Sequence, residues 1–305
     1  MVRILRTFGF GVSLLFAATA GAQVEGLQPT QAIVRVVGAN TPVSKNDLQI
    51  KVNGHGVPVT RVKPLLGPNG HVEVALLIDD GLRGNFANNL SEIKRFVFAL
   101  PPNVAIGIGY MQNGRVLFPQ GFSTEHETAV KAIRIPFGRA GINGSPYFCL
   151  SDLSKSWPTN TGAPRIVVMI TNGIDPYNGS VSPLNQNSPY VDTAIHDAQE
   201  HGLTVYAIPW NNRDFGGTGF GSFSGQNYLS DVVQNTGGEL LGQGMINPPT
   251  IRPMLDKFLV DLGQSFLVSF DAPVNKRLQD LKITAKARGT KISAPKAIRA
   301  GNVAQ

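Results

Sequence analysis

The sequence contains a single cysteine, Cys149, among 305 residues. One cysteine cannot form an intrachain disulfide, so a hydrophobic core must stabilise the fold, and the chain is long enough for one full domain with a smaller attachment. Because Cys149 stands between Phe148 and Leu150, we expect a buried, unreactive thiol. No histidine or helix terminus that would activate a nucleophilic thiol can be placed beside it from the sequence.

Long apolar runs are also lacking. The longest, from Phe8 to Phe16, is too short to cross a membrane as a helix. It follows Arg3 and Arg6 and precedes Ala20-Gly21-Ala22, the pattern of a secretory signal peptide cleaved near Ala22. We therefore predict that residues 1–22 are a signal peptide and that the remainder is exported, either to the periplasm or out of the cell.

Acidic residues are in the minority, and the net charge is +7. Removal of Arg3 and Arg6 with the signal peptide leaves +5 (7 − 2). Lysines alternate with apolar residues in Leu281–Ala287, as in a strand with a charged solvent face. Protection of an edge strand is the simplest explanation, and attraction to an anionic surface is the alternative. No aromatic-rich basic stretch or nucleic-acid motif is present, so nucleic acid is not an expected partner.

Motifs of catalytic sites are absent as well. The sequence has no Gly-x-Ser-x-Gly elbow, phosphate loop or dinucleotide fingerprint. None of the five histidines stands at metal-binding spacing from a cysteine or carboxylate motif. A hydrolase whose triad assembles from distant positions stays open as an outside alternative. We expect the protein not to be an enzyme.

Three regions follow the signal peptide. Residues 23–70 form a β segment and linker, with a turn at Asn53-Gly54. Residues 71–262 alternate between strands and helices, and residues 263–305 contain two strands and a basic tail. The two tail strands, 265–271 and 281–287, pair with each other or join the early strands in one small accessory sheet. We favour the second arrangement because a lone hairpin is marginal in water. The early strands are predicted at 32–37, 48–52 and 57–62.

The central region predicts an α/β, Rossmann-like domain. Strands that are apolar along their length and separated by helices indicate a mainly parallel sheet covered by helices on both faces. A hairpin is predicted over Asn113-Gly114. The apolar strands are at 72–78, 165–171 and 203–209, with a short one at 239–242. The helices are at 90–100, 125–133, 145–157, 191–201, 228–234 and 254–262.

The strand at 72–78 is followed by Asp79-Asp80-Gly81-Leu82-Arg83. Ligands of open α/β sheets bind at the carboxyl edge of the strands, so Asp79 stands where a functional site is expected. A magnesium site there would need compact oxygen ligands after the aspartate. Gly81 offers no side-chain oxygen and Arg83 is cationic.

The central region resembles a von Willebrand factor type A (VWFA) domain. The resemblance is carried by the order of elements, by Asp79, and by the segments Thr171-Asn172-Gly173, Gly202–Ile208 and Asn235–Leu240. With the signal peptide, the front β region and the basic tail, the chain looks like the exported VWFA-related proteins of acidobacteria.

The resemblance implies a metal-ion-dependent adhesion site that has lost most of its ligands. In the family, the site combines Asp-x-Ser-x-Ser with a threonine and a second aspartate, and its metal accepts a carboxylate from a partner. Asp79 matches the first aspartate, whereas Gly81 and Arg83 replace the serines. Ser145 stands at the threonine position and Asn172 at the second aspartate.

We therefore expect no metal, with Arg83 pairing with Asp79 and supplying the positive charge itself. If a cation is retained, its ligands would be Asp79, Ser145 and Asp175, with Asp80 as a further substitute. Ser145 before Pro146 is also a good helix N-cap.

The sequence thus predicts an exported, non-enzymatic protein-interaction module with a degenerate adhesion site. The loops 79–85, 141–147, 172–178 and 210–223 would bind an unknown protein partner. A metal-dependent adhesion module is the alternative. The glycine-rich run 216–221 is expected to be a flexible loop, with Trp210, Phe215, Phe220 and Phe223 as exposed contacts for a protein. A loop that folds back on the core is the alternative. The predicted partner-binding residues are Asp79, Asp80, Arg83, Asn85, Ser145, Tyr147, Asn172, Asp175, Trp210, Phe215 and Phe220.

Overall fold

The structure is a computed structural model that describes residues 26–38, 43–67, 70–138, 145–178, 187–211, 219–244 and 246–303. The predicted signal peptide lies outside the described residues. Within them, no helix is long and apolar enough to cross a membrane.

The central part is a five-stranded sheet with the order β7-β6-β5-β8-β9. Four strands are parallel, and only β7 at the edge runs antiparallel, to β6. The β6–β7 hairpin turns at Asn113 and Gly114, which both have positive φ, as the sequence predicts. The mainly parallel sheet is thereby confirmed. The strands are β5 (Val72–Asp79), β6 (Val104–Gln112), β7 (Arg115–Ser123), β8 (Arg165–Thr171) and β9 (Leu203–Pro209).

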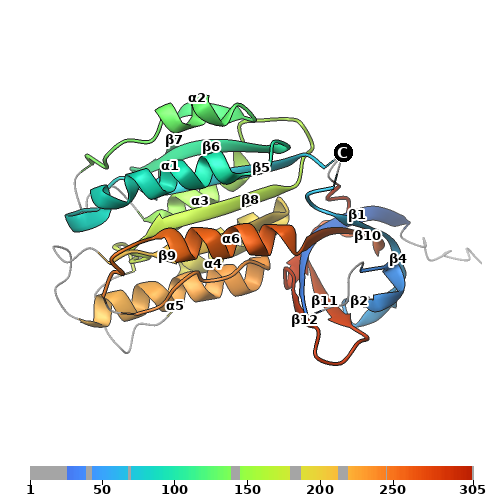
Figure 1. Ribbon diagram of the computed structural model, residues 1–305. Helices are drawn as coiled ribbons and strands as arrows, with labels where there is room; N and C mark the ends of the chain where they lie inside the picture. Colours follow the sequence, from blue (N-terminus) through green and yellow to red (C-terminus); the bar gives the residue numbers. More distant parts are fainter. Residues whose placement is uncertain are drawn as a thin grey trace, which may run out of the picture.

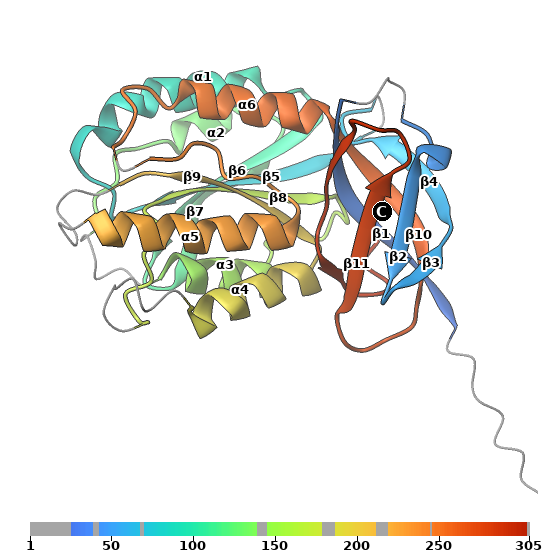
Figure 2. The same ribbon diagram turned by 90° about the horizontal axis from the view of Figure 1, so that it is seen from below.

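Helices cover both faces of this sheet (Figure 2). α1, α2 and α6 lie on one face, and α3, α4 and α5 lie on the other. Residues 84–89 form a short 3-10 helix, η2, before α1. The α-helices are α1 (Leu90–Ala99), α2 (His126–Lys131), α3 (Pro146–Lys155), α4 (Pro189–Glu200), α5 (Gly219–Thr236) and α6 (Arg252–Gly263).

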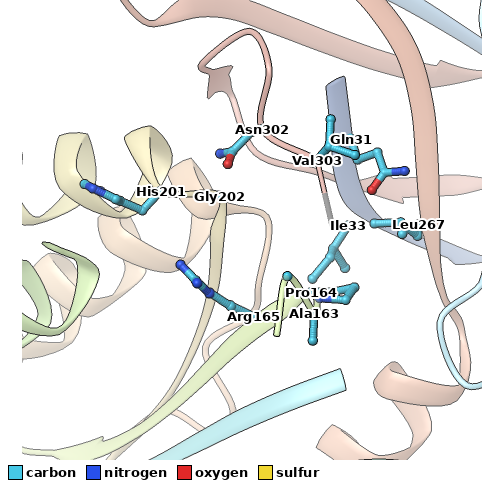
Figure 3. Close-up of a pocket in the computed structure, with 11 residues that line it drawn as sticks. Gln31, Ile33, Ala163, Pro164, Arg165, His201, Gly202, Leu267, Asn302 and Val303 are labelled. Atoms are coloured by element: carbon cyan, nitrogen blue, oxygen red, sulfur yellow. The ribbon is translucent and has the colours of Figure 1, made fainter. Parts of the chain in front are cut away.

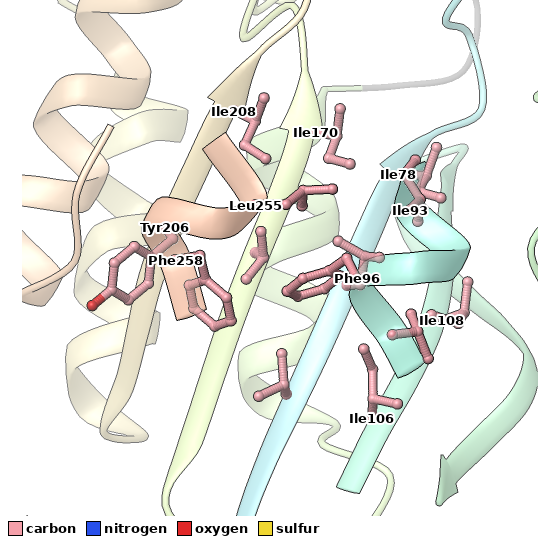
Figure 4. Close-up of a cluster of buried hydrophobic side chains, with 14 of the residues drawn as sticks. Ile78, Ile93, Phe96, Ile106, Ile108, Ile170, Tyr206, Ile208, Leu255 and Phe258 are labelled. Atoms are coloured by element: carbon pink, nitrogen blue, oxygen red, sulfur yellow. The ribbon is translucent and has the colours of Figure 1, made fainter. Parts of the chain in front are cut away.

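Each face of the sheet buries its own apolar cluster, because alternate side chains of a strand point to opposite faces. Ile78 and Phe96 belong to the cluster under α1 and α6 (Figure 4). Leu77 and Leu150 belong to the cluster under α3, α4 and α5. All β5 residues from Val72 to Ile78 are buried, which explains why this strand is apolar on both sides.

The terminal segments form two four-stranded antiparallel sheets, with the orders β12-β1-β10-β4 and β13-β11-β2-β3. The tail strands β10 and β11 pair with early strands and not with each other, as we favoured from the sequence. The prediction of one accessory sheet is wrong, because the strands divide between two sheets that share a third apolar cluster. The strands are β1 (Leu27–Val37), β2 (Leu48–Val52), β3 (His55–Val57), β4 (Val59–Pro64), β10 (Ser265–Pro273), β11 (Gln279–Ala285), β12 (Lys291–Ser293) and β13 (Ala297–Ile298). A 3-10 helix, η1 (Lys45–Asp47), precedes β2.

Other local predictions also need correction. Proline has no N–H for a strand ladder, and at Pro58 the strand predicted over 57–62 divides into β3 and β4, which lie in different sheets. The short strand predicted at 239–242 is a single parallel bridge from Leu240 to Ala207. The strand β11 lies inside its sheet rather than at an edge. Its Lys282 stands directly opposite Lys51 of β2. Because β13 pairs only with Gln279 and Asp280 of β11, the other side of β11 at Lys282 has no strand partner among the described residues, and edge protection stays a prediction.

The accessory sheets cover the edge of the central sheet formed by one set of strand ends, and they do not cover the edge formed by the opposite strand ends (Figure 1). In β1, Val34 points into the accessory core, whereas Ile33 packs on the central domain. Arg35 of β1 forms ion pairs with Glu239 and Asp261 of the central part. The covered edge is the one where the parallel strands begin, so their carboxyl ends face away from the accessory sheets.

Candidate functional site

The carboxyl edge of the central sheet gathers the polar residues that the sequence singled out. β5 and β8 are neighbours, and they end at Asp79 and Thr171 respectively. The helices α3, α4 and α5 also begin at this edge. α4 and α5 start here because each follows a parallel strand that ends here, and α3 starts here because it runs back to the beginning of β8.

Asp79 is held within the protein by two hydrogen bonds. Its Oδ1 accepts the Gly81 N–H at 2.8 Å, and its Oδ2 accepts the Thr171 hydroxyl at 2.8 Å. Burial raises the pKa of Asp79, whereas these two bonds and the charge of Arg83 oppose the rise. The contact with Thr171 joins the ends of two adjacent strands. The role of Thr171 was missed, although this residue stands in the quoted segment Thr171-Asn172-Gly173.

Asp80 is the carboxylate that pairs with an arginine. It is fully buried, and its Oδ1 accepts bonds from Arg134 Nη1 at 2.6 Å and from the Phe137 N–H at 3.3 Å. Its Oδ2 accepts from Gln112. The Arg134 guanidinium lies between the rings of Tyr110 and Phe137, 3.7 and 3.8 Å from their centroids. Arg134 thus neutralises the acidic end of β5.

The predicted pairing of Arg83 with Asp79 is wrong. Arg83 Nη1 donates to the backbone carbonyls of Leu82 at 2.8 Å and Asp80 at 3.3 Å. Within the described part of the chain it forms no ion pair with Asp79. Arg83 is committed to the carbonyls of its own loop, and the Asp79 oxygens accept the Gly81 N–H and the Thr171 hydroxyl instead.

Ser145 and Tyr147 hold the start of α3. Ser145 is the N-cap, as predicted, and its Oγ accepts the Tyr147 N–H at 3.2 Å. The Tyr147 hydroxyl donates to the Gly173 carbonyl at 2.6 Å. Both side chains are fully buried, so they support the neighbouring loop and present no surface to a partner.

Asn172 and Asp175 shape the loop after β8. Asn172 Oδ1 accepts the Ile174 N–H at 2.9 Å. Asp175 is buried, and its oxygens accept from the Tyr177 N–H at 3.2 Å and the Ser188 hydroxyl at 2.6 Å. Ser188 is in turn the N-cap of α4. These contacts fix the loop against α4.

Close backbone contact fixes the same loop against α5. Gly173 has φ +69°, which favours glycine. A Cβ at Gly225 of α5 would lie 2.2 Å from the Asn172 carbonyl oxygen, and one at Gly173 would lie 2.5 Å from the Gly225 carbonyl oxygen. Only glycine at both positions allows this approach.

The aromatic residues predicted on the last loop do not all reach the surface. Trp210 is fully buried and packs edge-to-face on Phe86, with ring centroids 5.5 Å apart. Its predicted role as an exposed contact is wrong, because the tryptophan completes the core at the end of β9. Phe215 lies outside the described residues. Phe220 falls in the first turn of α5, so part of the predicted glycine-rich loop is helix. The side chain of Phe220 lies outside the described set. Phe223 is 58% exposed, as predicted.

Several exposed apolar side chains at this edge were missed. Ile135 and Phe137, next to Asp80, are 60% and 70% exposed. Tyr177 is 53% exposed and Tyr190 is 37% exposed. Of the residues predicted to bind a partner, Asn85 in η2 is exposed.

Phe148 connects two of these rings in an aromatic cluster. Its ring centroid lies 5.0 Å from that of Tyr177 and 4.9 Å from that of Tyr190. The three residues come from α3, the loop after β8 and α4. No sequence pattern brings them together, because they are far apart along the chain.

A magnesium site at this edge would need a set of compact oxygen ligands in octahedral geometry. Asp79, Ser145 and Asp175 already accept hydrogen bonds from protein donors, and Gly81 and Arg83 supply no oxygen side chain. Among the described residues, no group of three or more histidine, cysteine or acidic side chains could hold a metal ion.

Comparison with known proteins finds structural similarity at low sequence identity only. No family model matches the sequence, and no curated protein matches it. Among solved structures, the chain is similar to BatB from Bacteroides thetaiotaomicron, with 13% identity, a TM-score of 0.45, and coverage of 63% of this chain and 98% of that one. It is similar to the vWF domain of the type V pili tip protein Mfa5 from Porphyromonas gingivalis, with 12% identity, a TM-score of 0.43, and coverage of 62% and 94%.

A third similar structure is proximal thread matrix protein 1 from the mussel byssus, with a zinc-occupied MIDAS motif. Its identity is 11%, its TM-score is 0.40, and the coverage is 67% of this chain and 48% of that one. All three TM-scores are below 0.5, and similarities at this level do not identify binding residues.

Cys149 lies beneath this edge and is buried, as predicted. Burial raises the pKa of its thiol to about 12, and the nearby charge of Asp79 adds to the rise. Since the thiolate is the reactive form, we expect almost no reaction with a thiol reagent such as DTNB at pH 8 in the folded protein. One equivalent should react in denaturant. Rapid reaction of the native protein, at the rate of a free cysteine, would contradict this burial.

Proposed function

We propose that this protein is an exported, non-enzymatic protein-interaction module that binds its partner without metal, through the loops at the carboxyl edge of the central sheet. The observation that carries the proposal is the division of the two edges. The accessory sheets cover the amino edge and not the carboxyl edge (Figure 1). Among the described residues at the carboxyl edge, several aromatic side chains are exposed.

The hydrogen-bonded polar residues and the side chains at the surface of the loops have separate tasks in this proposal. Asp79, Asp80, Ser145, Asn172 and Asp175 hold the loops by internal hydrogen bonds. The partner would contact the side chains that these loops display: Asn85, Ile135, Phe137, Phe148, Tyr177, Tyr190 and Phe223. Aromatic residues in particular supply large contact areas in protein interfaces.

A matched pair of phenylalanines tests the location of the binding surface. Phe137 at the carboxyl edge is 70% exposed, and Phe98, near the end of α1 and therefore at the other edge, is 54% exposed. Immobilised protein would be offered the exported proteins of the producing organism. We expect Phe137→Ser, alone or with Tyr177→Ser, to lose at least tenfold in retention of a bound protein, because each removes a contact of hot-spot type. Phe98→Ser should retain it. Equal retention by all variants would refute the proposed surface.

Thermal unfolding with EDTA and then with millimolar Mg²⁺, Mn²⁺ or Ca²⁺ tests the metal. A cation at about 100 times its Kd would stabilise the protein by about 2.7 kcal/mol. We expect no shift in Tm and no effect of EDTA on partner retention. A shift that disappears in Asp79→Ala would favour the metal-dependent adhesion module instead. Turnover in a broad hydrolase screen would favour the alternative that the protein is a hydrolase.

A further inference from the structure

A cavity of about 130 Å³ lies where the accessory sheets meet the amino edge of the central sheet (Figure 3). Its walls come from both parts of the molecule. The central domain contributes Pro164, Arg165 and Gly202, and the accessory part contributes Ile33 and Leu267. A cavity of about 150 Å³ accommodates benzene, so this one has room for a ligand of about six non-hydrogen atoms.

Arg165 brings a positive charge to this cavity without a matching carboxylate. Among the residues that the structure describes, no ion pair neutralises its guanidinium. Its Nη2 makes one long contact, 3.4 Å, to the Thr159 carbonyl, and the guanidinium lies 5.3 Å from the centroid of the Trp157 ring. Burial lowers the pKa of Arg165, and the charge of Glu73 opposes that shift. Apart from the contact with Thr159, the guanidinium donors make no hydrogen bond to another described residue, so they are available for a ligand.

Glu73 is the acidic neighbour, but its carboxylate is occupied. It is buried and accepts bonds from Trp157 Nε1 at 2.7 Å and from the hydroxyls of Thr159 at 2.6 Å and Thr161 at 2.8 Å. Glu73 stands opposite Arg165 in the register of β5 and β8, but these three neutral donors bond both of its oxygens. Among the described residues, Glu73 and Arg165 form no ion pair.

The cavity has a polar end and an apolar end. Arg165 extends toward the turn at His201 and Gly202, near the amide of Asn302 (Figure 3). Gly202 makes room for this amide, since a Cβ there would lie 2.6 Å from Asn302 Nδ2. The His201 ring nitrogens point away from the cavity, and Nδ1 bonds the Asp197 carbonyl at 2.8 Å. Ile33 and Leu267 provide apolar surface at the other end, where Gln31 also lines the cavity (Figure 3).

We propose that this junction cavity binds a small carboxylate, with the carboxylate on Arg165 and the aliphatic body against Ile33 and Leu267. The planar fork of a guanidinium matches a carboxylate through two parallel hydrogen bonds. The carboxylate belongs either to a free short-chain acid or to the end of a peptide chain. Because the site is at the edge opposite the proposed partner surface, it is independent of that proposal.

Butyrate, which has six non-hydrogen atoms, is the probe. Binding to the purified protein is measured by calorimetry and by chemical-shift changes in NMR spectra, and we expect a dissociation constant in the millimolar range. Butyramide has the same shape without the charge and should bind at least about tenfold more weakly. If butyramide binds equally well, the cavity is an apolar pocket and the proposal fails.

Substitutions at Arg165 complete the test. Arg165→Gln should weaken butyrate binding by about 10- to 100-fold. Arg165→Lys keeps the charge but loses the planar fork, so its affinity for butyrate should lie between those of Arg165→Gln and the wild type. Arg61→Gln, an exposed arginine of β4, is the control and should bind like the wild type. Near-ultraviolet circular dichroism confirms that each variant is folded. Unchanged binding by folded Arg165→Gln, or no butyrate binding by the wild type, overturns the proposal.

The source of the carboxylate is distinguished with a short peptide that ends in a free carboxylate and the same peptide with a terminal amide. Tighter binding of the acid peptide than of butyrate, lost on amidation and in Arg165→Gln, assigns the site to a chain terminus. Weaker binding of both peptides than of butyrate assigns it to a free acid. Either result supports a carboxylate site.

Discussion

Arg134→Met is expected to lower the free energy of unfolding by about 3 kcal/mol, because it leaves the buried Asp80 carboxylate without its cation. This value is at the lower end of the range for a broken buried pair. The Arg134 side chain is 29% exposed, and Asp80 keeps its bonds from Gln112 and the Phe137 N–H. Urea unfolding at neutral pH, followed by tryptophan fluorescence, measures the change.

The double variant Asp80→Asn, Arg134→Met is the control. It removes both charges, so it should be more stable than Arg134→Met alone if the loss comes from an unpaired carboxylate. Additive losses would show instead that Arg134 acts only through its packing between Tyr110 and Phe137.

Gly225→Ala is expected to destabilise the protein by about 1–3 kcal/mol through overpacking. Alanine in a helix is ordinarily favoured over glycine by about 1 kcal/mol, so the sign of this effect is opposite to that of helix propensity. The cause is the 2.2 Å approach of the new Cβ to the Asn172 carbonyl oxygen. That oxygen belongs to the backbone and cannot rotate away, so the loop must separate from α5. Partner retention should fall as well, because Tyr177 is on the same loop.

Gly263→Ala is the matched control. Gly263 is also helical, at the end of α6, and a Cβ there meets nothing within 4 Å. We expect stability equal to that of the wild type or up to about 1 kcal/mol higher. Thermal and urea unfolding of the two variants side by side measure the difference. Equal stability of the two alanine variants would mean that the contact between α5 and the loop is not tight in solution.

The location of the candidate site was predictable because it depends on hydrophobic periodicity and on short local sequences. Continuous apolar strands that alternate with helices require a parallel sheet. The carboxyl ends of parallel strands meet at one edge, which places Asp79 beside the loop at Asn172. The N-cap role of Ser145 was predictable for a similar reason, since it depends only on Ser145-Pro146 and the helix that follows.

The partners of the acidic residues were not predictable. Asp80 meets Arg134 across 54 positions of the sequence, and Asp79 meets Thr171 across 92. The chain has 27 lysine and arginine residues, and composition does not distinguish among them. Arg83 was the natural choice because it is close in sequence. It is nevertheless turned toward the carbonyls of its own loop, and Thr171 bonds Asp79 instead.

The sequence by itself determined most of the elements, the parallel direction of the central strands and the edge to which Asp79 belongs. The hydrophobic period and the turn residues that decide these features act over a few residues at a time. The tertiary structure alone decided which side chains of the loops are buried. It put Trp210 in the core, left Phe137 and Tyr177 exposed, and placed Arg165 in the junction cavity. Burial and ion pairing depend on side chains that the fold brings together from distant positions, and local pattern carries no information about those distances.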